Sequence, residues 1–539
     1  STFTDNNFSL YISFSQHRPA HNDCWIVIQR TKTMPIVNAK TVEPAKYRWQ
    51  QVKDATSTAP SLQRRGNGTE NWVGLRKENA RGQYDFHILV KARTHQPFTL
   101  ASLKQQLVHG LLRQRFEHPD IACEAFWDDE FGPLIRYTTP SDDLEAGIWA
   151  QESVQIHATP QNGFELRREI AAGREAQNKS SKSFTVHALA DVTNHDTVMN
   201  EGSDVEFLVH FNHIYWDGIS ARLFVGDLLR SLGQNLEAAR YDWGQEIKNL
   251  SVPLLDALNI DIKTLSKDYD DSLEEFVASM FRFNSSHSIQ LGVEPGLPDT
   301  AVLQLKPGTC QKIIHGVKSR LGPDYTITHL AQAATLLALL KTNPLSQEAL
   351  PEKSVIMPLP VNGRRYLREE FAHCQYGSCQ ACAVVEFDNL EQFAVDFEDK
   401  VAVIDALVRA MEITKKSYDY WLSKPFLLPL GLAKDNFLSA LLESSESQPD
   451  GKTVPIIASD GLNDQYIPKT VSSQDESLVL SVEDIICLTD SYTPGFGLRM
   501  EAWNGATTIS LGYCDGSYTS EEAHTFLQNI KGFMMALAG

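Results

Sequence analysis

The feature that most constrains this chain is a strand-like run that leads, through a short polar turn, into a helix-like run. Apolar residues alternate along 205–211 (Val205, Phe207, Val209, Phe211), which predicts a β-strand with one buried face. Isoleucine and leucine recur at helical spacing along 218–232. Between the two runs stands His213-Ile-Tyr-Trp-Asp217-Gly218. The pattern therefore predicts a strand–turn–helix unit with a histidine and an aspartate in the turn.

Strand-like and helix-like segments are mixed along the whole chain of 539 residues, which predicts an α/β fold class. Helices are expected at 99–116, 328–340, 393–421 and 520–537, the last with Ser520 as its N-cap, and strands at 184–189, 354–359, 478–489 and 498–513. The stretch 285–300 is rich in Ser, Gly and Pro, so we interpret it as the connection between two halves of the chain.

The charge balance bears on the possible partners. There are 49 Lys and Arg against 68 Asp and Glu, which gives a formal net charge of −19. An acidic surface repels phosphate backbones and anionic headgroups, so we expect neither a nucleic-acid nor a membrane partner. No apolar run approaches the ~20 residues of a membrane span. Eight cysteines without framework spacing favour a reducing compartment, and we expect a cytoplasmic location.

His213 is the candidate catalytic residue. If the strand persists that far, its ring leaves the backbone on the same face as the apolar residues of 205–211. Partial burial lowers the pKa of an imidazole and keeps it neutral near pH 7, which is the state that a general base needs. A structural interpretation exists beside this one. A lone histidine is usually structural, Asp217 is a favoured N-cap, and Gly218 permits a tight turn into the helix.

Other motifs point to chemistry less strongly. His373-Cys374-x4-Cys379-x2-Cys382 has the residue types of a zinc site, but no second pair of ligands follows. The segment 380–385 also has the pattern of a core strand, so we expect no metal. The chain lacks Gly-x-Ser-x-Gly, Gly-x-Gly-x-x-Gly and phosphate-loop motifs, which argues against a hydrolase and against a nucleotide cofactor bound by such a motif.

His213-x-x-x-Asp217-Gly218 between a strand and a helix resembles the signature of the chloramphenicol-acetyltransferase-like superfamily. That superfamily includes plant and fungal CoA-dependent acyltransferases and the condensation domains of peptide synthetases. Four further segments resemble family elements: 111–119, 326–340, 360–365 and 492–497. Asn212 stands where condensation domains usually carry a first histidine, and 494–497 lacks the Asp and Trp of the plant loop. In length and in overall amino-acid sequence the chain most resembles the fungal trichothecene 15-O-acetyltransferases.

The resemblance implies a fold and a reaction. The expected fold has two similar domains, each a mixed sheet flanked by helices, with a tunnel between them. The N-terminal domain would be 1–285, joined by a crossover segment around 478–503, and the C-terminal domain 300–539. The expected enzyme is a monomer that transfers acetyl from acetyl-CoA to the C-15 hydroxyl of a trichothecene-type sesquiterpenoid, with no permanently bound cofactor. Two alternatives are a condensation-type catalyst for carrier-bound acyl groups and a degenerate member that only binds ligands.

The resemblance also implies roles for single residues. His213 would be the base, and Gly218 would give the tight turn. Asp217 would turn away from the substrates and pair with an arginine, first Arg364 and second Arg365. For the arginines, solvated surface charge or a contact to a CoA phosphate is the alternative. The candidate substrate- or CoA-contacting residues are Tyr215, Trp216, Arg364, Arg365 and Tyr492. For the two aromatic residues of the motif, a place in the core is the competing interpretation.

Overall fold

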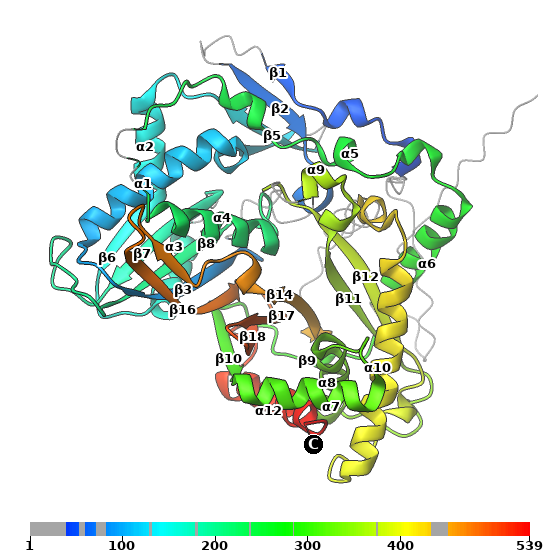
Figure 1. Ribbon diagram of the computed structural model, residues 1–539. Helices are drawn as coiled ribbons and strands as arrows, with labels where there is room; N and C mark the ends of the chain where they lie inside the picture. The colour runs from blue at the N-terminus through cyan, green and yellow to red at the C-terminus, as the bar shows by residue number, and fades with distance from the viewer. Residues whose placement is uncertain are drawn as a thin grey trace, which may run out of the picture.

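The computed structural model describes residues 39–538 except 53–59, 72–81, 129–131, 178–181, 235, 237–238, 284, 373–375 and 433–450. Within this part of the chain, two main groups of strands are each packed against their own helices (Figure 1). Both groups contain parallel and antiparallel pairs, as the pairings of β6 with β7 and of β14 with β17 illustrate. The predicted α/β class, with mixed sheets flanked by helices, is therefore confirmed.

The larger sheet carries the strand that leads to His213. Among the described residues it has six strands, in the order β15 (Thr470–Ser472), β16 (Leu478–Thr489), β3 (Phe86–Thr94), β8 (Asp204–Phe211), β7 (Phe184–Ala190) and β6 (Val154–Ala158). β6 is parallel to β7, and the other neighbours are antiparallel. β8 is a central strand, so both of its edges are paired, with β3 and with β7.

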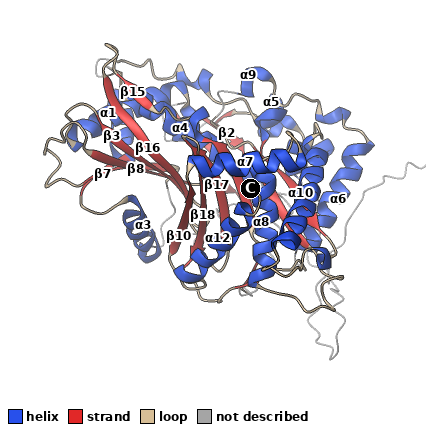
Figure 2. Cartoon of the chain, turned by 60° about the horizontal axis from the view of Figure 1, so that its bottom comes forward, coloured by secondary structure: helices blue, strands red, loops and turns tan. Residues whose placement is uncertain are grey.

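The alternation along β8 sorts its side chains between two helical layers. Val205, Phe207, Val209 and Phe211 join one core cluster with residues of α1 (Leu100–Glu117) and α4 (Gly218–Ser231). Leu208 belongs to a second cluster, which includes Leu166 of α3 (Gly163–Gln177). Figure 2 shows α3 on the opposite side of this sheet from α1 and α4. Both faces of β8 are thus buried, which corrects the single buried face predicted from the sequence, and one of them packs beneath α4.

The second main sheet contacts helices α7 (Pro307–Leu321), α8 (Ile327–Thr342) and α12 (Ser520–Met535) of the C-terminal half, as Figure 1 also shows. In the described chain its order is β10 (Pro298–Leu305), β18 (Ala506–Cys514), β17 (Phe496–Trp503) and β14 (Ile456–Leu462), and β11 (Val355–Asn362) pairs separately with β12 (Gln380–Phe387). Further helices of this half are α6 (Lys267–Phe283) and α10 (Lys400–Leu422).

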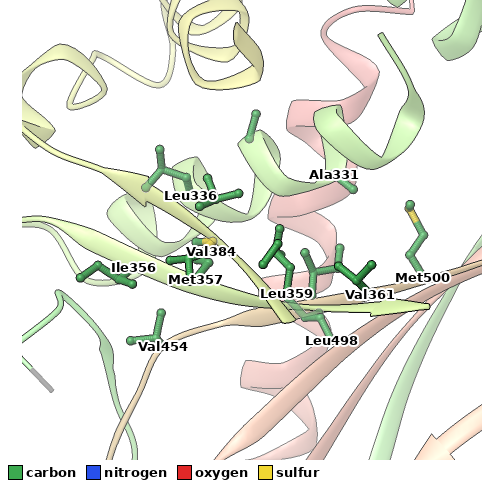
Figure 3. Close-up of a cluster of buried hydrophobic side chains, with 14 of the residues drawn as sticks. Ala331, Leu336, Ile356, Met357, Leu359, Val361, Val384, Val454, Leu498 and Met500 are labelled. Atoms are coloured by element: carbon green, nitrogen blue, oxygen red, sulfur yellow. The ribbon is translucent and has the colours of Figure 1, made fainter. Parts of the chain in front are cut away.

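A single large core forms between these helices and strands. α8 is almost entirely buried because Leu and Ala residues occupy all of its faces, as its apolar sequence predicts. Figure 3 shows Ala331 and Leu336 of α8 above Met357 and Leu359 of β11, with Leu498 of β17 nearby. The core therefore fixes the strands from which several residues of the candidate site project.

Smaller elements complete the described chain. They are a sheet of β1 (Gln50–Val52), β2 (Ser61–Arg65), β5 (Gly132–Thr138) and β4 (Glu124–Asp128), the pair β9 (Ile289–Gln290) and β13 (Lys452–Thr453), and the helices α2 (Asp143–Ser153), α5 (Leu254–Ala257) and α9 (Glu369–Ala372). No helix among the described residues has both the length and the apolar character that crossing a bilayer requires.

Three local expectations are corrected by the structure. The cap of α12 is Thr519 and not Ser520, because the Thr519 hydroxyl accepts the hydrogen bond from the backbone of Glu522. The segment 285–300 is not a continuous loop, since it contains β9 and the start of β10. The helix expected from residue 393 begins only at Lys400, where Asp399 provides the N-cap.

The strand expected at 478–489 is β16, but the single strand expected at 498–513 is wrong, because the chain turns there and forms the antiparallel pair β17 and β18. β16 pairs with β3 of the larger sheet, whereas β17 pairs with β18 of the second sheet. Arg167 of α3 ties this region together, because its Nε donates to Asp490 at 2.8 Å and its Nη1 to Thr300 at 2.6 Å. The domain boundaries at 285 and 300 remain predictions, but the chain does pass from the second sheet into the first and back.

Candidate active site

His213 lies in the turn between β8 and α4, two residues beyond the end of the strand. The condition that the strand persists to His213 is not met, since β8 ends at Phe211. The side-chain oxygen of Asn212 accepts a hydrogen bond from the backbone of Ile214 at 3.0 Å, and its carbonyl accepts one from Tyr215 at 3.1 Å. This Asx turn stops the strand. The His213 ring still packs edge-on against Phe86, with centroids 5.2 Å apart, so it stays next to the apolar face of the sheet.

The environment of His213 favours the neutral imidazole. Burial lowers the pKa of the ring, and the positive charge of Arg499 lowers it further. The backbone carbonyl of His213 and the negative charges of Asp217 and Asp85 oppose this shift, but the pKa remains below its ordinary value. His213 is accordingly uncharged near pH 7 and can accept a proton.

The two ring nitrogens of His213 differ in their access. Nδ1 is buried and makes no hydrogen bond. The residue as a whole is only partly buried, and Nε2 is not among its enclosed atoms. Nε2 also has no hydrogen-bond partner in the described part of the chain. It is therefore the nitrogen that a hydroxyl group arriving from solvent can reach.

Asp217 has two tasks at the start of α4. Its Oδ1 accepts hydrogen bonds from the backbones of Ile219, at 2.9 Å, and Ser220, at 2.7 Å, and the Ser220 hydroxyl accepts one from the backbone of Asp217 in return. This is a capping box. Oδ2 lies 2.9 Å from Nη1 of Arg364 and accepts a hydrogen bond from the backbone of Cys379 at 2.7 Å. The carboxylate thus joins the helix start to the second half of the chain.

The pair of Asp217 and Arg364 is buried. Both residues are 4 % exposed, and Arg364 projects from a short 3-10 helix (Gly363–Tyr366) that directly follows β11. Burial by itself would raise the pKa of Asp217, but the Arg364 guanidinium and the backbone N–H groups hold that pKa below its ordinary value. Arg364, the first partner named from the sequence, is the arginine found at Asp217. Arg365 is exposed and lies outside this pair.

Gly218 is the first residue of α4 and adopts ordinary helical backbone. Its glycine is needed for space and not for an unusual turn. A Cβ at this position would lie 2.9 Å from Nη2 of Arg499 and 3.1 Å from Nη1 of Arg222. Two guanidinium groups therefore pack directly on the backbone at Gly218. The tight-turn role expected from the sequence is corrected to one of close approach.

The sequence analysis did not identify the charged group that surrounds Gly218. Arg222 of α4 is fully buried, and its Nη2 donates to Asp460 at 3.0 Å and to Glu501 at 2.7 Å. Arg499 binds the same aspartate through two hydrogen bonds of 2.9 Å, from Nε and from Nη2. We call these four residues the arginine–carboxylate quartet. The only local signal for it is an arginine inside the apolar stretch of α4, and that signal does not reveal the partners.

Tyr215 and Trp216 lie in packed surroundings. The Tyr215 hydroxyl accepts a hydrogen bond from the backbone of Ala125 at 2.7 Å. Trp216 is 2 % exposed, and its indole N–H donates to Ser183 at 3.1 Å while the ring packs against Phe211. For Trp216 the structure favours the core interpretation over a wall of the acceptor channel.

Tyr492 and two cysteines of the motif are buried. Tyr492 follows β16, is buried, and its backbone donates to Gln83 at 2.6 Å. Burial and the neighbouring Asp490 raise the pKa of its hydroxyl. Cys379 and Cys382 are buried at the start of β12, and burial raises the pKa of the Cys379 thiol to about 12. His373 and Cys374 lie outside the described residues. Within the described chain no group of three His, Cys, Asp or Glu side chains could hold a metal.

Comparison with solved structures defines the class of this fold. The first condensation domain of the CDA synthetase superposes with a TM-score of 0.53 at 12 % identity, covering 88 % of this chain and 95 % of that one. Polyketide synthase associated protein 5 from Mycobacterium tuberculosis gives 0.52 at 13 % identity, with 88 % and 99 % covered. Together with the His213 turn, these likenesses place the chain in the chloramphenicol-acetyltransferase-like fold.

The family follows from closer relatives. The family model for 15-O-acetyltransferase Tri3 matches residues 40–439, so the chain belongs to this family of acetyltransferases. It is 38 % identical to trichothecene 15-O-acetyltransferase TRI3 of Fusarium sporotrichioides, covering 92 % of this chain and 97 % of that one. It is 35 % identical, with the same coverage, to trichothecene O-acetyltransferase TRI3 of Trichoderma arundinaceum. The solved structure of the Fusarium sporotrichioides TRI3 enzyme superposes with a TM-score of 0.87 at 37 % identity, covering 92 % and 98 %. The resemblance drawn from the sequence is confirmed.

Proposed function

We propose that this protein transfers the acetyl group of acetyl-CoA to the C-15 hydroxyl of a trichothecene, with His213 as the general base. The observation that carries the proposal is the state of that imidazole. It is neutral near pH 7, it leaves Nε2 open to solvent, and it belongs to a chain of the Tri3 family. The relatives named as trichothecene acetyltransferases support the choice of acceptor.

In the proposed reaction both substrates meet at His213. The acceptor hydroxyl gives its proton to Nε2 while its oxygen bonds to the thioester carbonyl carbon. The resulting tetrahedral oxyanion collapses, the carbon–sulfur bond breaks, and the imidazolium returns the proton to the CoA thiolate. A positioned base of this kind contributes about 10²–10⁴-fold to the rate. Bringing both substrates together in a tunnel between the two domains would add the effect of proximity.

Asp217 and Arg364 are proposed to position the base. Their ion pair joins the start of α4 to the 3-10 helix after β11, and the backbone of Cys379 binds the same carboxylate. The turn that carries His213 is thereby held between Asn212, which ends β8, and Asp217, which starts α4. Neither charged group needs to touch substrate in order to fix the direction of the ring.

The two competing functions are separated by what the enzyme consumes. A condensation-type catalyst would use acyl groups bound to a carrier protein, and the condensation-domain likeness, at 12 % identity, concerns the fold alone. A degenerate member would bind ligands without turnover. The proposed setting is a monomer in a reducing cytoplasm. The described cysteines are free, which supports the reducing compartment.

The test is to follow free thiol with acetyl-CoA and a trichothecene that carries a 15-hydroxyl, and to identify the ester by mass spectrometry. We expect turnover by the parent and a loss of at least about 10²-fold in His213→Ala, with an unchanged melting temperature. His315→Ala, at an exposed position on α7, is the matched control and should keep full activity. Turnover by His213→Ala at the parental rate, or transfer from a carrier protein but not from acetyl-CoA, would contradict the proposal.

A further inference from the structure

A second charged group lies next to His213, and the proposed reaction has not yet used it. The guanidinium of Arg499, on β17, lies 5.8 Å from the centroid of the Phe86 ring. The His213 ring is 5.2 Å from the same centroid. Arg499 also approaches the first backbone unit of α4, since a Cβ on Gly218 would be 2.9 Å from its Nη2. The cation and the imidazole are therefore neighbours across one aromatic ring.

Arg499 is held firmly, but only along one edge. Its Nε and Nη2 bind the two oxygens of Asp460 at 2.9 Å each. Asp460 is itself fixed by Arg222, at 3.0 Å, and Arg222 also binds Glu501. A guanidinium bound in this two-point way is rigid, because its five N–H groups lie in one plane. The remaining nitrogen, Nη1, therefore points in a direction that the quartet has already set.

Nη1 of Arg499 makes no hydrogen bond to any described residue, although every other nitrogen of the two arginines in the quartet has a partner. Nη1 is not enclosed either, since the Arg499 side chain keeps 12 % of its surface exposed while that of Arg222 keeps 0 %. In the described chain the quartet thus leaves one cationic donor unused, on the arginine that packs, like His213, against Phe86.

We propose that Nη1 of Arg499 donates a hydrogen bond to the thioester carbonyl oxygen as that oxygen becomes an oxyanion. The inference rests on the proposed function. In the step concerned, the acceptor oxygen bonds to the carbonyl carbon, the hydroxyl proton moves to Nε2 of His213, and the carbonyl π electrons become the negative charge on oxygen. Collapse of this intermediate expels CoA thiolate. A fixed cationic donor is stronger toward the oxyanion than toward the neutral carbonyl, which is what lowers the barrier.

Two other roles for Arg499 fit the structure less well. A purely structural arginine at this place would have its last nitrogen bound within the protein. An anchor for the phosphates of CoA would be expected to carry excess positive charge, but the quartet is balanced, with two arginines and two carboxylates. An electrically neutral quartet with one unused N–H donor is better matched to the oxyanion of the tetrahedral intermediate, which carries a single negative charge and exists only briefly.

The test uses Arg499→Gln and Arg499→Lys in the full chain, with acetyl-CoA and a 15-hydroxylated trichothecene. We expect kcat to fall by about 10²–10³-fold in Arg499→Gln, with KM for both substrates nearly unchanged and with the loss persisting at every pH. Arg499→Lys keeps the charge that neutralises Asp460, so it protects the fold while it removes the third nitrogen, and it should also lose kcat. Arg93→Gln, an exposed arginine on β3, is the control and should match the parent.

Each contrary result has a distinct meaning. Full recovery of kcat at high pH would show that Arg499 acts only on the pKa of His213. A rise in KM for acetyl-CoA with kcat retained would show an anchor for CoA. Parental kinetics in both folded variants would show a structural residue. Any of these overturns the assignment of Arg499 and leaves the proposed function standing, whereas a parent enzyme without acetyl transfer overturns both.

Discussion

Asp217 offers the sharpest test of how the site is held, because its carboxylate combines a helix cap with a buried ion pair. Replacing an N-cap aspartate by alanine costs about 0.5–2 kcal/mol. Removing one partner of a buried ion pair costs about 3–5 kcal/mol, because the other charge stays desolvated. Arg364 is 4 % exposed and would be left in that state. We therefore expect Asp217→Ala to lower the free energy of unfolding by about 3.5–7 kcal/mol.

Asp217→Asn separates the two contributions. Asparagine caps a helix as well as aspartate does, so this variant keeps the cap through its side-chain oxygen. It loses the negative charge and the second oxygen, which accepts hydrogen bonds from Arg364 and from the backbone of Cys379. It should be more stable than Asp217→Ala by about 0.5–2 kcal/mol. The double variant Asp217→Asn with Arg364→Met removes the unpaired cation as well. It should recover about 1–3 kcal/mol relative to Asp217→Asn alone, because buried ion pairs can be replaced by apolar groups at little cost.

Urea denaturation followed by circular dichroism provides the measurement, with the midpoint and slope of the first transition compared between variants. The control is Asp204→Asn, which breaks the exposed pair of Asp204 with Arg93 and should change the stability by less than about 0.5 kcal/mol. The reasoning fails if Asp217→Asn is as stable as the parent. It also fails if the double variant is less stable than Asp217→Asn, since that sign excludes an unpaired cation as the cause.

Further predictions concern the base, the helix start and the core. The pKa of His213 lies below its ordinary value, 6.5. We therefore expect kcat/KM to be constant near pH 7 and to fall about tenfold per pH unit only below this lowered pKa. A pH–rate profile in which activity is already lost above pH 6.5 would contradict this. The pKa of the His213 imidazole is lower in the folded chain than in the unfolded chain. As the pH falls below 6.5, the unfolded chain therefore binds the proton more readily, and His213 lowers the stability of the fold. Gly218→Ala should lower both the melting temperature and kcat, since its Cβ meets two guanidinium groups. Gly147→Ala, in α2 with no atom within 4 Å of the added Cβ, should instead raise the melting temperature slightly. Trp216→Phe should lower the free energy of unfolding by about 1–3 kcal/mol through loss of the hydrogen bond to Ser183, and it should leave KM for the acceptor unchanged. A raised KM with unchanged stability would instead indicate that Trp216 lines the substrate channel.

Local signals in the sequence predicted much of the scaffold that carries the site. Alternation along 205–211 predicted β8 to within one residue at its start, and helical spacing along 218–232 predicted α4, which spans Gly218–Ser231. The predicted strand 478–489 has the bounds of β16. The turn was predicted less well. The strand ends at Phe211 because the Asn212 side chain binds the backbone of Ile214, a choice that the period-2 pattern does not record.

The sequence by itself determined the chemistry of the turn and the elements on each side of it, because strand alternation, helix periodicity and capping all act between residues a few positions apart. Only the tertiary structure decided what surrounds the turn. Arg364 is 147 positions from Asp217, and Glu501 is 279 positions from Arg222. Such pairs form because packed sheets bring buried charges together, and a charge without its partner is costly in the interior. No short-range pattern carries that information, so Arg499 and its free nitrogen became visible only in the folded chain.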